Sequence, residues 1–362
     1  MHGAAHGATN GSIQGAIHEE VQGATTEIGK VLEMTSEVKA LLQCVLKDLR
    51  YYCNGGGRED VLSTKAVALL RSLCPQFEGA LWMEALLLSG EGDIACIEAK
   101  YVSCREQADW LRERRRVDRD GSYRRWNARV YDDLDVIDED VPRTFIEQGH
   151  GYRSSTSVEL TEVLEAHVVA EARLGSSGMG YVQGMADVAG YLLQRLAPWQ
   201  AFGCLRTLCA RPLVRMFCRL NVDEWLLISS VFSSLLGLCC PTLFTKLTEW
   251  QLEPVMYLPE WLLPLWTRSV RPDVASYIFA LLIVEGDDTI LIRSALAVCS
   301  AIEPQLLKCD DMPSCRKLLS ESPSGVSLET FAQMLQHCAV GDDVLAPLMR
   351  TPKPLAAADD TC

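Results

Sequence analysis

One short stretch of the chain presents an arginine from a constrained turn. It reads Ile137-Asp-Glu-Asp140-Val-Pro142-Arg143-Thr144-Phe145. Pro142 fixes its own φ and disfavours helical backbone at the residue before it, so we expect Arg143 to emerge from a fixed turn. Asp140 stands three residues before Arg143, where its carboxylate can hold the guanidinium in one rotamer. The stretch therefore predicts that the planar guanidinium of Arg143 is held in position to donate two parallel hydrogen bonds.

A second stretch presents an uncharged amide. Tyr181-Val-Gln183-Gly184-Met185 follows a glycine-rich run at residues 175–180 and opens an apolar segment. Gln183 therefore places a hydrogen-bond donor and an acceptor together at an exposed helix entrance. Taken alone, Arg143 is explained as well by a surface salt bridge, and Gln183 by a solvated helix terminus. Neither stretch defines a site without the other.

The sequence lacks the patterns of most catalytic and cofactor sites. It contains no Gly-x-x-x-x-Gly-Lys-Ser/Thr loop, no Gly-x-Ser-x-Gly elbow and no His-Glu-x-x-His motif. The run at 175–180 has no lysine and no preceding strand, which predicts a tight turn between helices. His167 is spaced as a helix-face residue, so a packing role is expected. We predict no cofactor of the chain's own.

Cysteine placement favours buried thiols over a metal module. The chain has 15 cysteines, an odd number, with no Cys-x-x-Cys pair and with most of them in apolar runs. A zinc module needs paired ligands at short spacing. Reduced cysteines that pack as small apolar side chains are the expectation, which also predicts a cytosolic location.

Charge is unevenly distributed along an acidic chain. The 34 Lys and Arg against 48 Asp and Glu give a net charge of −14, which argues against general nucleic-acid binding. Residues 105–129 differ, with nine Arg against five acids, and they include Trp110, Tyr123 and Trp126. Such a patch is able to contact RNA or lipid headgroups. The alternative, which we favour, is a solvated and salt-bridged insertion between core helices.

Helical periodicity dominates the rest of the chain. Apolar residues over 156–172 recur three and four residues apart, and Thr156 and Glu159 are spaced as a capping box at the start of that helix. Further apolar stretches are separated by prolines, and alternating strand patterns with hairpin turns are scarce. We predict an all-α fold, a single large domain of many short helices.

The ends of the chain and one apolar stretch set the domain limits. Residues 1–30 are predicted to be a low-complexity, disordered leader, and 351–362 a disordered tail. Helical extensions are expected at 31–69 and 311–350. Residues 225–245 carry no charge, and a stretch of this length could cross a bilayer. Its four serines and Pro241 favour instead a buried helix that ends near Pro241.

The two stretches together resemble the paired signatures of the TBC domain, a family of GTPase-activating proteins for Rab small GTPases. Ile137-x-x-Asp140-x-x-Arg143 with Thr144-Phe145 is similar to the first signature, and Tyr181-x-Gln183-Gly184-Met185 to the second. The resemblance continues through Pro241-Thr-Leu-Phe-Thr-Lys-Leu247, Trp261-Leu262 and Glu285-Gly286, and back to Gly79 and Trp82. It covers about residues 70–310, which we predict to be the TBC domain.

The resemblance implies a role for each residue of the two signatures. Arg143 would be an arginine finger that neutralises charge on the transferring phosphoryl group, and Gln183 a glutamine finger that positions the attacking water. Asp140 would orient Arg143, and Ile137 would anchor the turn in the core. Thr144 would also help to hold the turn that carries Arg143. Three further residues would position Gln183: Tyr181, Gly184 and Met185.

The resemblance also implies the partner. It is a Rab-type GTPase in its GTP state, which would carry the nucleotide and Mg²⁺ itself. The protein would be cytoplasmic or peripheral to endomembranes, recruited to a membrane indirectly through that partner. Vesicle trafficking is the expected process.

Three positions depart from the family pattern. Ala186 stands where many members have asparagine after the Gln-Gly-Met run, Phe279-Ala280 replaces the usual Trp-Asp pair, and Glu78 occupies the place of an early arginine. They touch scaffold hydrogen bonds and leave both fingers intact. The rival interpretation is a catalytically inactive Rab-binding scaffold, and a third is a helical adaptor that uses the Arg105–Arg129 patch.

Overall fold

The described part of the protein is built from helices and turns. The computed structural model describes residues 78–79, 82–83, 94–117, 128–144, 155–175, 178–285 and 288–338, and these contain no strand. The predicted all-α fold is confirmed. The predicted leader, the 31–69 extension, the tail, Phe145 and Gly286 lie outside these residues.

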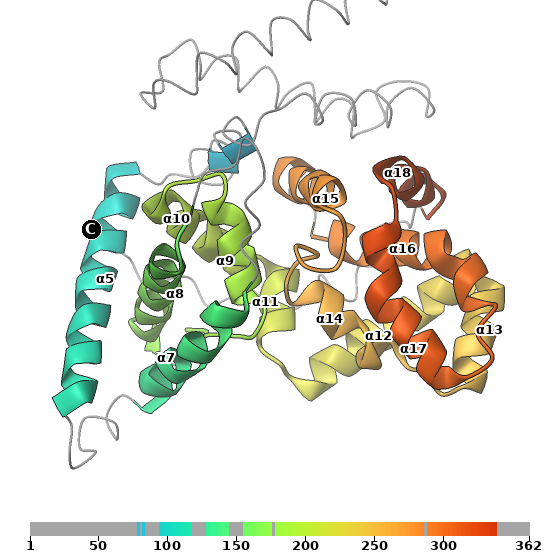
Figure 1. Cartoon of the computed structure of the whole chain (residues 1–362), viewed down its shortest axis with the longest axis horizontal. Coiled ribbons are helices and arrows are strands. Elements are labelled where there is room, and N and C mark those ends of the chain that lie inside the picture. The colour runs from blue at the N-terminus through green and yellow to red at the C-terminus, as the bar shows by residue number, and fades with distance from the viewer. Residues whose placement is uncertain are drawn as a thin grey trace, which may run out of the picture.

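The helices form two neighbouring groups along the long axis of the molecule (Figure 1). The first group holds α5 (Ile94–Val117), α7 (Ala128–Asp140), α8 (Ser157–Ala172), α9 (Met185–Leu193) and α10 (Pro198–Ala210). Short α11 (Pro212–Cys218) leads to the second group. That group holds α12 (Val222–Cys239), α13 (Pro241–Glu249), α14 (Leu258–Leu262), α15 (Pro272–Glu285), α16 (Ile290–Leu306), α17 (Met312–Glu321) and α18 (Leu328–His337). The α9 and α14–α15 segments face each other where the groups meet.

Helix α8 is the centre of the first group. It packs against α5, α7, α9 and α10, and its residues from Val163 to Glu171 are buried on every side. The predicted capping box starts it: Thr156 Oγ1 accepts from the Glu159 backbone N–H at 3.1 Å, and Glu159 Oε2 accepts from the Thr156 N–H at 3.0 Å. His167 is fully buried in this helix, so the predicted packing role is confirmed.

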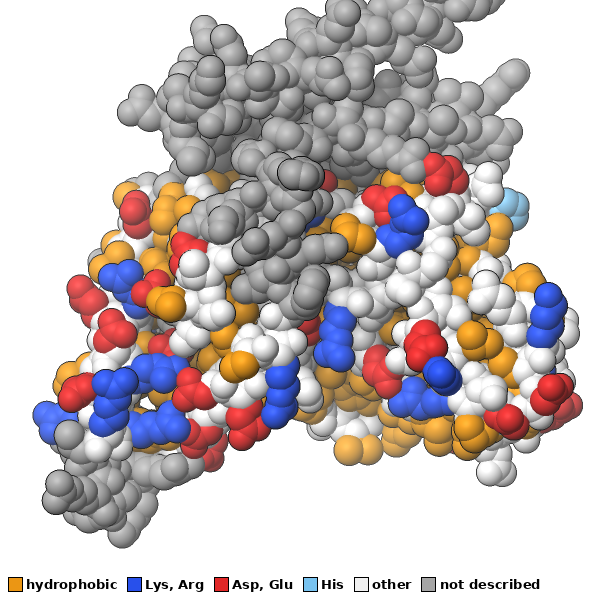
Figure 2. All heavy atoms as spheres, in the orientation of Figure 1, with side chains coloured by type: hydrophobic (Ala, Val, Ile, Leu, Met, Phe, Trp, Pro, Cys, Tyr) orange, Lys and Arg blue, Asp and Glu red, His pale blue; other side chains and the backbone are white. Residues whose placement is uncertain are grey.

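The described part of the Arg-rich segment is paired with acids, as predicted, but its residues up to Val117 belong to a core helix rather than to an insertion. Residues 94–117 form the long helix α5, whose Tyr101, Cys104 and Leu111 are buried against the core. Arg112 forms ion pairs with Glu165 of α8 and with Asp138 of α7. Figure 2 shows the interleaved blue and red side chains on this face. Because these described arginines already have carboxylate partners, the RNA- or lipid-binding interpretation loses its basis there.

Helix α12 ends where the proline predicted, but it lies on the surface. It stops at Cys239, and Pro241 is the first residue of α13. Its length and composition would suffice to cross a membrane, and one-third of it is buried in the protein. Trp225, Ile228 and Phe232 face the core while Val222 and Leu238 are exposed. The expectation of a buried helix was therefore wrong in part, because only one face is covered.

Most of the described cysteines pack as predicted, but Cys96 is disulfide-bonded, so the expectation of reduced cysteines was wrong there. Eight of the ten free cysteines in the described residues are buried, and Cys239 and Cys309 are partly exposed. Burial raises the pKa of the Cys240 and Cys315 thiols to about 11. These thiols therefore stay protonated at neutral pH and behave as apolar side chains.

Candidate functional site

Arg143 leaves the end of α7 through a single 3-10 turn. The turn spans Val141–Arg143 with Pro142 inside it, as the sequence predicted. Thr144 closes the turn, because its N–H and its Oγ1 both donate to the Asp140 backbone oxygen at 3.0 Å. Ile137 is fully buried and Val141 nearly so, which fixes the turn in the core. Arg143 itself is exposed.

Gln183 stands just before α9, at a turn that requires glycine. Gly184 has a φ of 101°, and a Cβ there would lie 2.9 Å from the carbonyl carbon of Leu263. Both the left-handed conformation and the close approach therefore exclude other residues. The Met185 side chain is buried, and its Sδ lies 3.4 Å from the Val182 nitrogen that donates to it. Gln183 is exposed at this fixed corner.

A hydrogen bond joins the two signature segments. The Tyr181 hydroxyl donates to Asp140 Oδ2 at 2.9 Å. Burial, followed by the nearby Asp140 carboxylate, raises the pKa of Tyr181 above its ordinary value, so the phenol remains a donor. Tyr181 thus ties the segment that precedes Gln183 to the end of the helix that leads to Arg143.

This bond gives Asp140 a partner that the sequence did not predict, while its predicted role in orienting Arg143 stays a prediction. Among the described residues, no hydrogen bond or ion pair joins Asp140 to Arg143. The carboxylate accepts from Tyr181, and the Arg143 side chain is exposed at the end of the 3-10 turn. Asp140 positions the second segment directly, and Arg143 is positioned by its backbone.

Two residues that the sequence analysis missed hold the same segment. Arg129 of α7 donates to the Gly178 backbone oxygen at 3.0 Å. One turn later, Asp133 accepts from the Tyr181 N–H and packs on Gly180, where a Cβ would lie 2.4 Å from its Oδ2. Burial raises the pKa of Asp133, and that hydrogen bond and Arg129 lower it in part. Their positions relative to Asp140 place all three on one face of a helix, which was the available signal.

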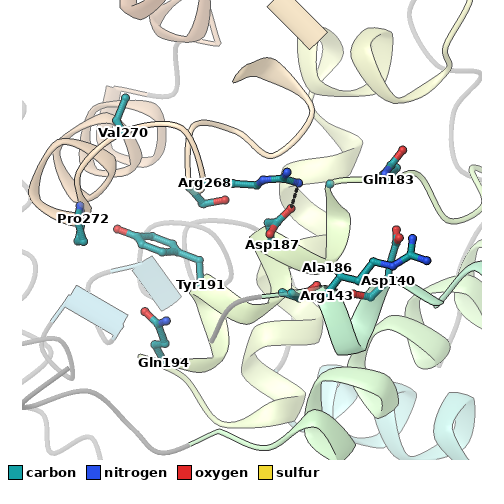
Figure 3. Close-up of a pocket in the computed structure, with 13 residues that line it drawn as sticks. Asp140, Arg143, Gln183, Ala186, Asp187, Tyr191, Gln194, Arg268, Val270 and Pro272 are labelled. Carbon is teal, nitrogen blue, oxygen red and sulfur yellow. Dashed lines mark hydrogen bonds and ion pairs between the residues drawn. The ribbon is translucent and has the colours of Figure 1, made fainter. Parts of the chain in front are cut away.

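Arg143 and Gln183 line one groove. It has a volume of about 430 Å³ and lies between the surface formed by the 3-10 turn and α9 and the loop after α14. In Figure 3, the guanidinium of Arg143 and the amide of Gln183 both project on the same side of α9. The structure therefore brings together the two residues that the sequence singled out. The described residues lining the groove are Asp140, Arg143, Thr144, Gln183, Gly184, Ala186, Asp187, Tyr191, Gln194, Thr267, Arg268, Val270 and Pro272.

The opposite side of the groove carries a second arginine. Arg268 lies 4.0 Å from Asp187 of α9, and its side chain is 72% exposed. Burial raises the pKa of the Asp187 carboxyl, while Arg268 lowers it in part. The groove thus has a cation on each side, with a neutral amide at its mouth.

A buried ion pair lies behind the groove at one of the departures from the family pattern. Glu78 Oε2 accepts from Arg195 Nε at 2.7 Å, and both side chains are buried. The Arg195 guanidinium also lies 3.9 Å from the ring centre of Tyr191 and donates to Ser276 Oγ at 3.1 Å. Glu78 therefore has a defined structural role despite its departure from the pattern.

The other two departures are apolar and packed. Phe279 is fully buried, with its ring centre 4.9 Å from that of Tyr191 and 5.5 Å from that of Trp82. Ala186 and Ala280 are buried as well. The absence of an asparagine and an aspartate at these places leaves an apolar core behind the groove wall.

This arrangement suits a group that comes from outside the chain. An exposed guanidinium donates two parallel hydrogen bonds to oxyanions, and an amide can orient a water molecule. The side chains facing the groove offer charge and hydrogen bonds rather than an activated nucleophile. The fold and site thus define a helical protein that presents polar groups to a partner.

The comparisons with known proteins give the family. The model of the Rab-GTPase-TBC domain matches residues 87–307, so the chain belongs to this family. The match lies within the range 70–310 that the sequence predicts for the TBC domain. The exact limits of the five segments into which we divided the chain stay a prediction.

Curated relatives share part of their length with the chain. Human TBC1 domain family member 14 is 28% identical over 182 residues, 49% of this chain and 25% of that protein. Mouse Carabin is 33% identical over 123 residues, 34% of this chain and 25% of that protein. The chain spans about a quarter of the length of these relatives.

Solved structures share the fold. The Chlamydomonas flagellar RabGAP TBC domain superposes with a TM-score of 0.54 at 20% identity, over 76% of this chain and 84% of that one. The Ypt/Rab-GAP domain of Gyp1p gives 0.55 at 15% identity, over 81% and 91%. At these identities the two structures support the helical TBC fold of the chain.

Proposed function

We propose that the protein accelerates GTP hydrolysis by a Rab GTPase, with Arg143 and Gln183 as its two fingers. The observation that carries this proposal is that both residues are exposed and line one groove, held there by buried neighbours on different segments. The GTP-bound form of the Rab brings nucleotide and Mg²⁺ to that groove. The protein acts from the cytoplasm, and it reaches endomembranes through its partner to act in vesicle trafficking.

Each finger supplies what phosphoryl transfer needs. Negative charge is spread over the phosphoryl oxygens in the transition state, and the protein's task is positioning and charge stabilisation. The Arg143 guanidinium neutralises that charge through two oxygens at once. Gln183 donates and accepts through one amide, which suits it to orienting the attacking water.

The support of each finger explains why the site is prepared before the partner binds. Ile137, Val141 and Thr144 fix the turn that carries Arg143, and Gly184 and Met185 fix the corner that carries Gln183. Tyr181 connects the two through Asp140. Because little ordering is left for the encounter, more of the binding energy reaches the transition state.

A single-turnover assay tests the proposal. Phosphate release is measured from a panel of GTP-loaded Rabs, alone and with the protein. Arg143→Lys keeps the charge but loses the fork, so we expect it to remove about a hundredfold or more of the acceleration. Gln183→Ala is expected to cost at least about tenfold.

A matched control separates the fingers from general effects. Arg271→Lys changes an exposed arginine that pairs with Asp273 outside the groove, and it should leave the rate unchanged. Equal rates for the wild-type protein and both finger variants would contradict the assignment. Rab binding without acceleration would favour the inactive scaffold instead.

A further inference from the structure

The loop that faces the two fingers is held in a conformation that L-residues rarely adopt. Leu265 and Trp266 lie in the loop after α14, beyond Leu263 and Pro264, and have φ values of 45° and 70°. Left-handed backbone at two consecutive non-glycine residues is strained, because each Cβ crowds the neighbouring carbonyl oxygen. Both side chains are buried, and Trp266 Nε1 donates to the Leu291 backbone oxygen at 3.3 Å. The core therefore holds this turn in place against its strain.

The strained turn determines which residues of the loop line the groove. The backbone just before it, at Leu263 and Pro264, packs against Gly184 so closely that a Cβ there would lie 2.9–3.0 Å away. The backbone just after it presents Thr267 and Arg268 to the groove. The backbone of the loop is thus packed against the Gly184 turn, and Arg268 lines the same groove as both fingers.

Arg268 is available to a partner. Its side chain is 72% exposed, and its contact with Asp187 is at the outer limit of an ion pair, 4.0 Å. An exposed pair of that length contributes little to stability. Asp187 is by contrast only 18% exposed, so it keeps Arg268 directed over the groove while leaving most of the guanidinium open.

We propose that Arg268 is a specificity-determining residue that binds a carboxylate on the surface of the partner GTPase. This proposal rests on the proposed function. Arg268 stands on the loop side of the groove, across from the fingers, and it already rests against a carboxylate in the free protein. A carboxylate from the partner, desolvated when the partner covers the groove, would replace or share the weak contact with Asp187.

The expected signature is in binding rather than in chemistry. Arg268→Ala removes a rim charge, so KM for the responding GTP-loaded Rab should rise about tenfold while kcat stays within about twofold. The salt dependence of kcat/KM should become shallower for this variant, because one charged contact is lost. Arg268→Glu should weaken binding further, and substituting Lys for one acidic surface residue of that Rab should restore it.

Matched measurements decide between outcomes. Arg271→Ala removes an exposed arginine from the same stretch of chain outside the groove, and it should behave like the wild type. Thermal unfolding of all variants checks that the fold is kept. Equal kinetics for Arg268→Ala and Arg271→Ala would overturn the inference while leaving the fingers in place.

Two other results have distinct meanings. A fall in kcat with unchanged KM would place Arg268 at the phosphates and overturn the carboxylate assignment. If the wild-type protein neither binds nor accelerates any Rab in the panel, the proposed function fails and the role of Arg268 fails with it.

Discussion

The hydrogen bond between Tyr181 and Asp140 offers a direct test of how the two fingers are coordinated. Tyr181→Phe deletes only the hydroxyl, so the ring, which is 8% exposed, stays in its packed place. A hydrogen bond to a charged group contributes about 1.5–3 kcal/mol, and water at the half-buried Asp140 recovers part of it. A net loss of about 1–2 kcal/mol corresponds to roughly 5–30-fold in an equilibrium or a rate.

That loss should appear in kcat/KM for the stimulated hydrolysis of GTP by the Rab. The bond fixes the segment that leads to Gln183 relative to the helix that leads to Arg143, so we expect a fall of about tenfold in the single-turnover assay. Asp140→Asn keeps an acceptor oxygen and should cost less. In a double-mutant cycle, Tyr181→Phe and Asp140→Ala should be strongly non-additive.

The reasoning is refuted by either of two results. An unchanged kcat/KM in Tyr181→Phe would show that the bond does not coordinate the fingers. Fully additive losses would show that Tyr181 and Asp140 act separately. A lower melting temperature with unchanged kinetics would reduce the bond to a purely structural role.

Two further predictions concern stability. Glu78→Ala leaves the Arg195 guanidinium buried without its carboxylate, so chemical denaturation should show a loss of about 3–5 kcal/mol, whereas methionine at both positions should recover most of it; equal stability of the single and double variants would contradict this. Burial lowers the pKa of His167 from 6.5 to about 4, with Glu171 raising it in part and Arg206 lowering it. The unfolded state binds the proton first, so the free energy of unfolding should fall by about 3 kcal/mol as the pH drops from 6.5 to 4, and His167→Leu should remove that component; a variant with the same pH profile as the wild type would refute it.

Local rules predicted the elements that carry the site. The capping box at Thr156, the helix restart at Pro241 and the turn at Pro142 all follow from backbone restrictions within a few residues. Such features are legible in sequence because their causes are close in sequence.

Contacts between side chains that are distant in the chain could not be predicted from the sequence in this way. Asp140 was expected to hold Arg143, but its carboxylate meets Tyr181, 41 residues away in the chain. Arg268 and the strained backbone before it gave no signal, because positive φ at Leu265 and Trp266 is imposed by burial of their own side chains. Both results depend on how separate helices are packed, which no short spacing encodes.

Helix α7 explains how one domain can hold two fingers from separate segments. Arg129, Asp133 and Asp140 lie along one face of it, and each binds the segment between Gly178 and Tyr181. The same helix ends in the turn that carries Arg143. A displacement of α7 would therefore move both fingers together, and their relative position depends on short local connections rather than on the distant core.

The departures at Glu78, Phe279 and Ala280 lie behind the groove wall, where a buried ion pair and aromatic packing fill the space. Divergence there changes stability first, and it reaches the fingers only if it shifts α7 or the Gly184 corner.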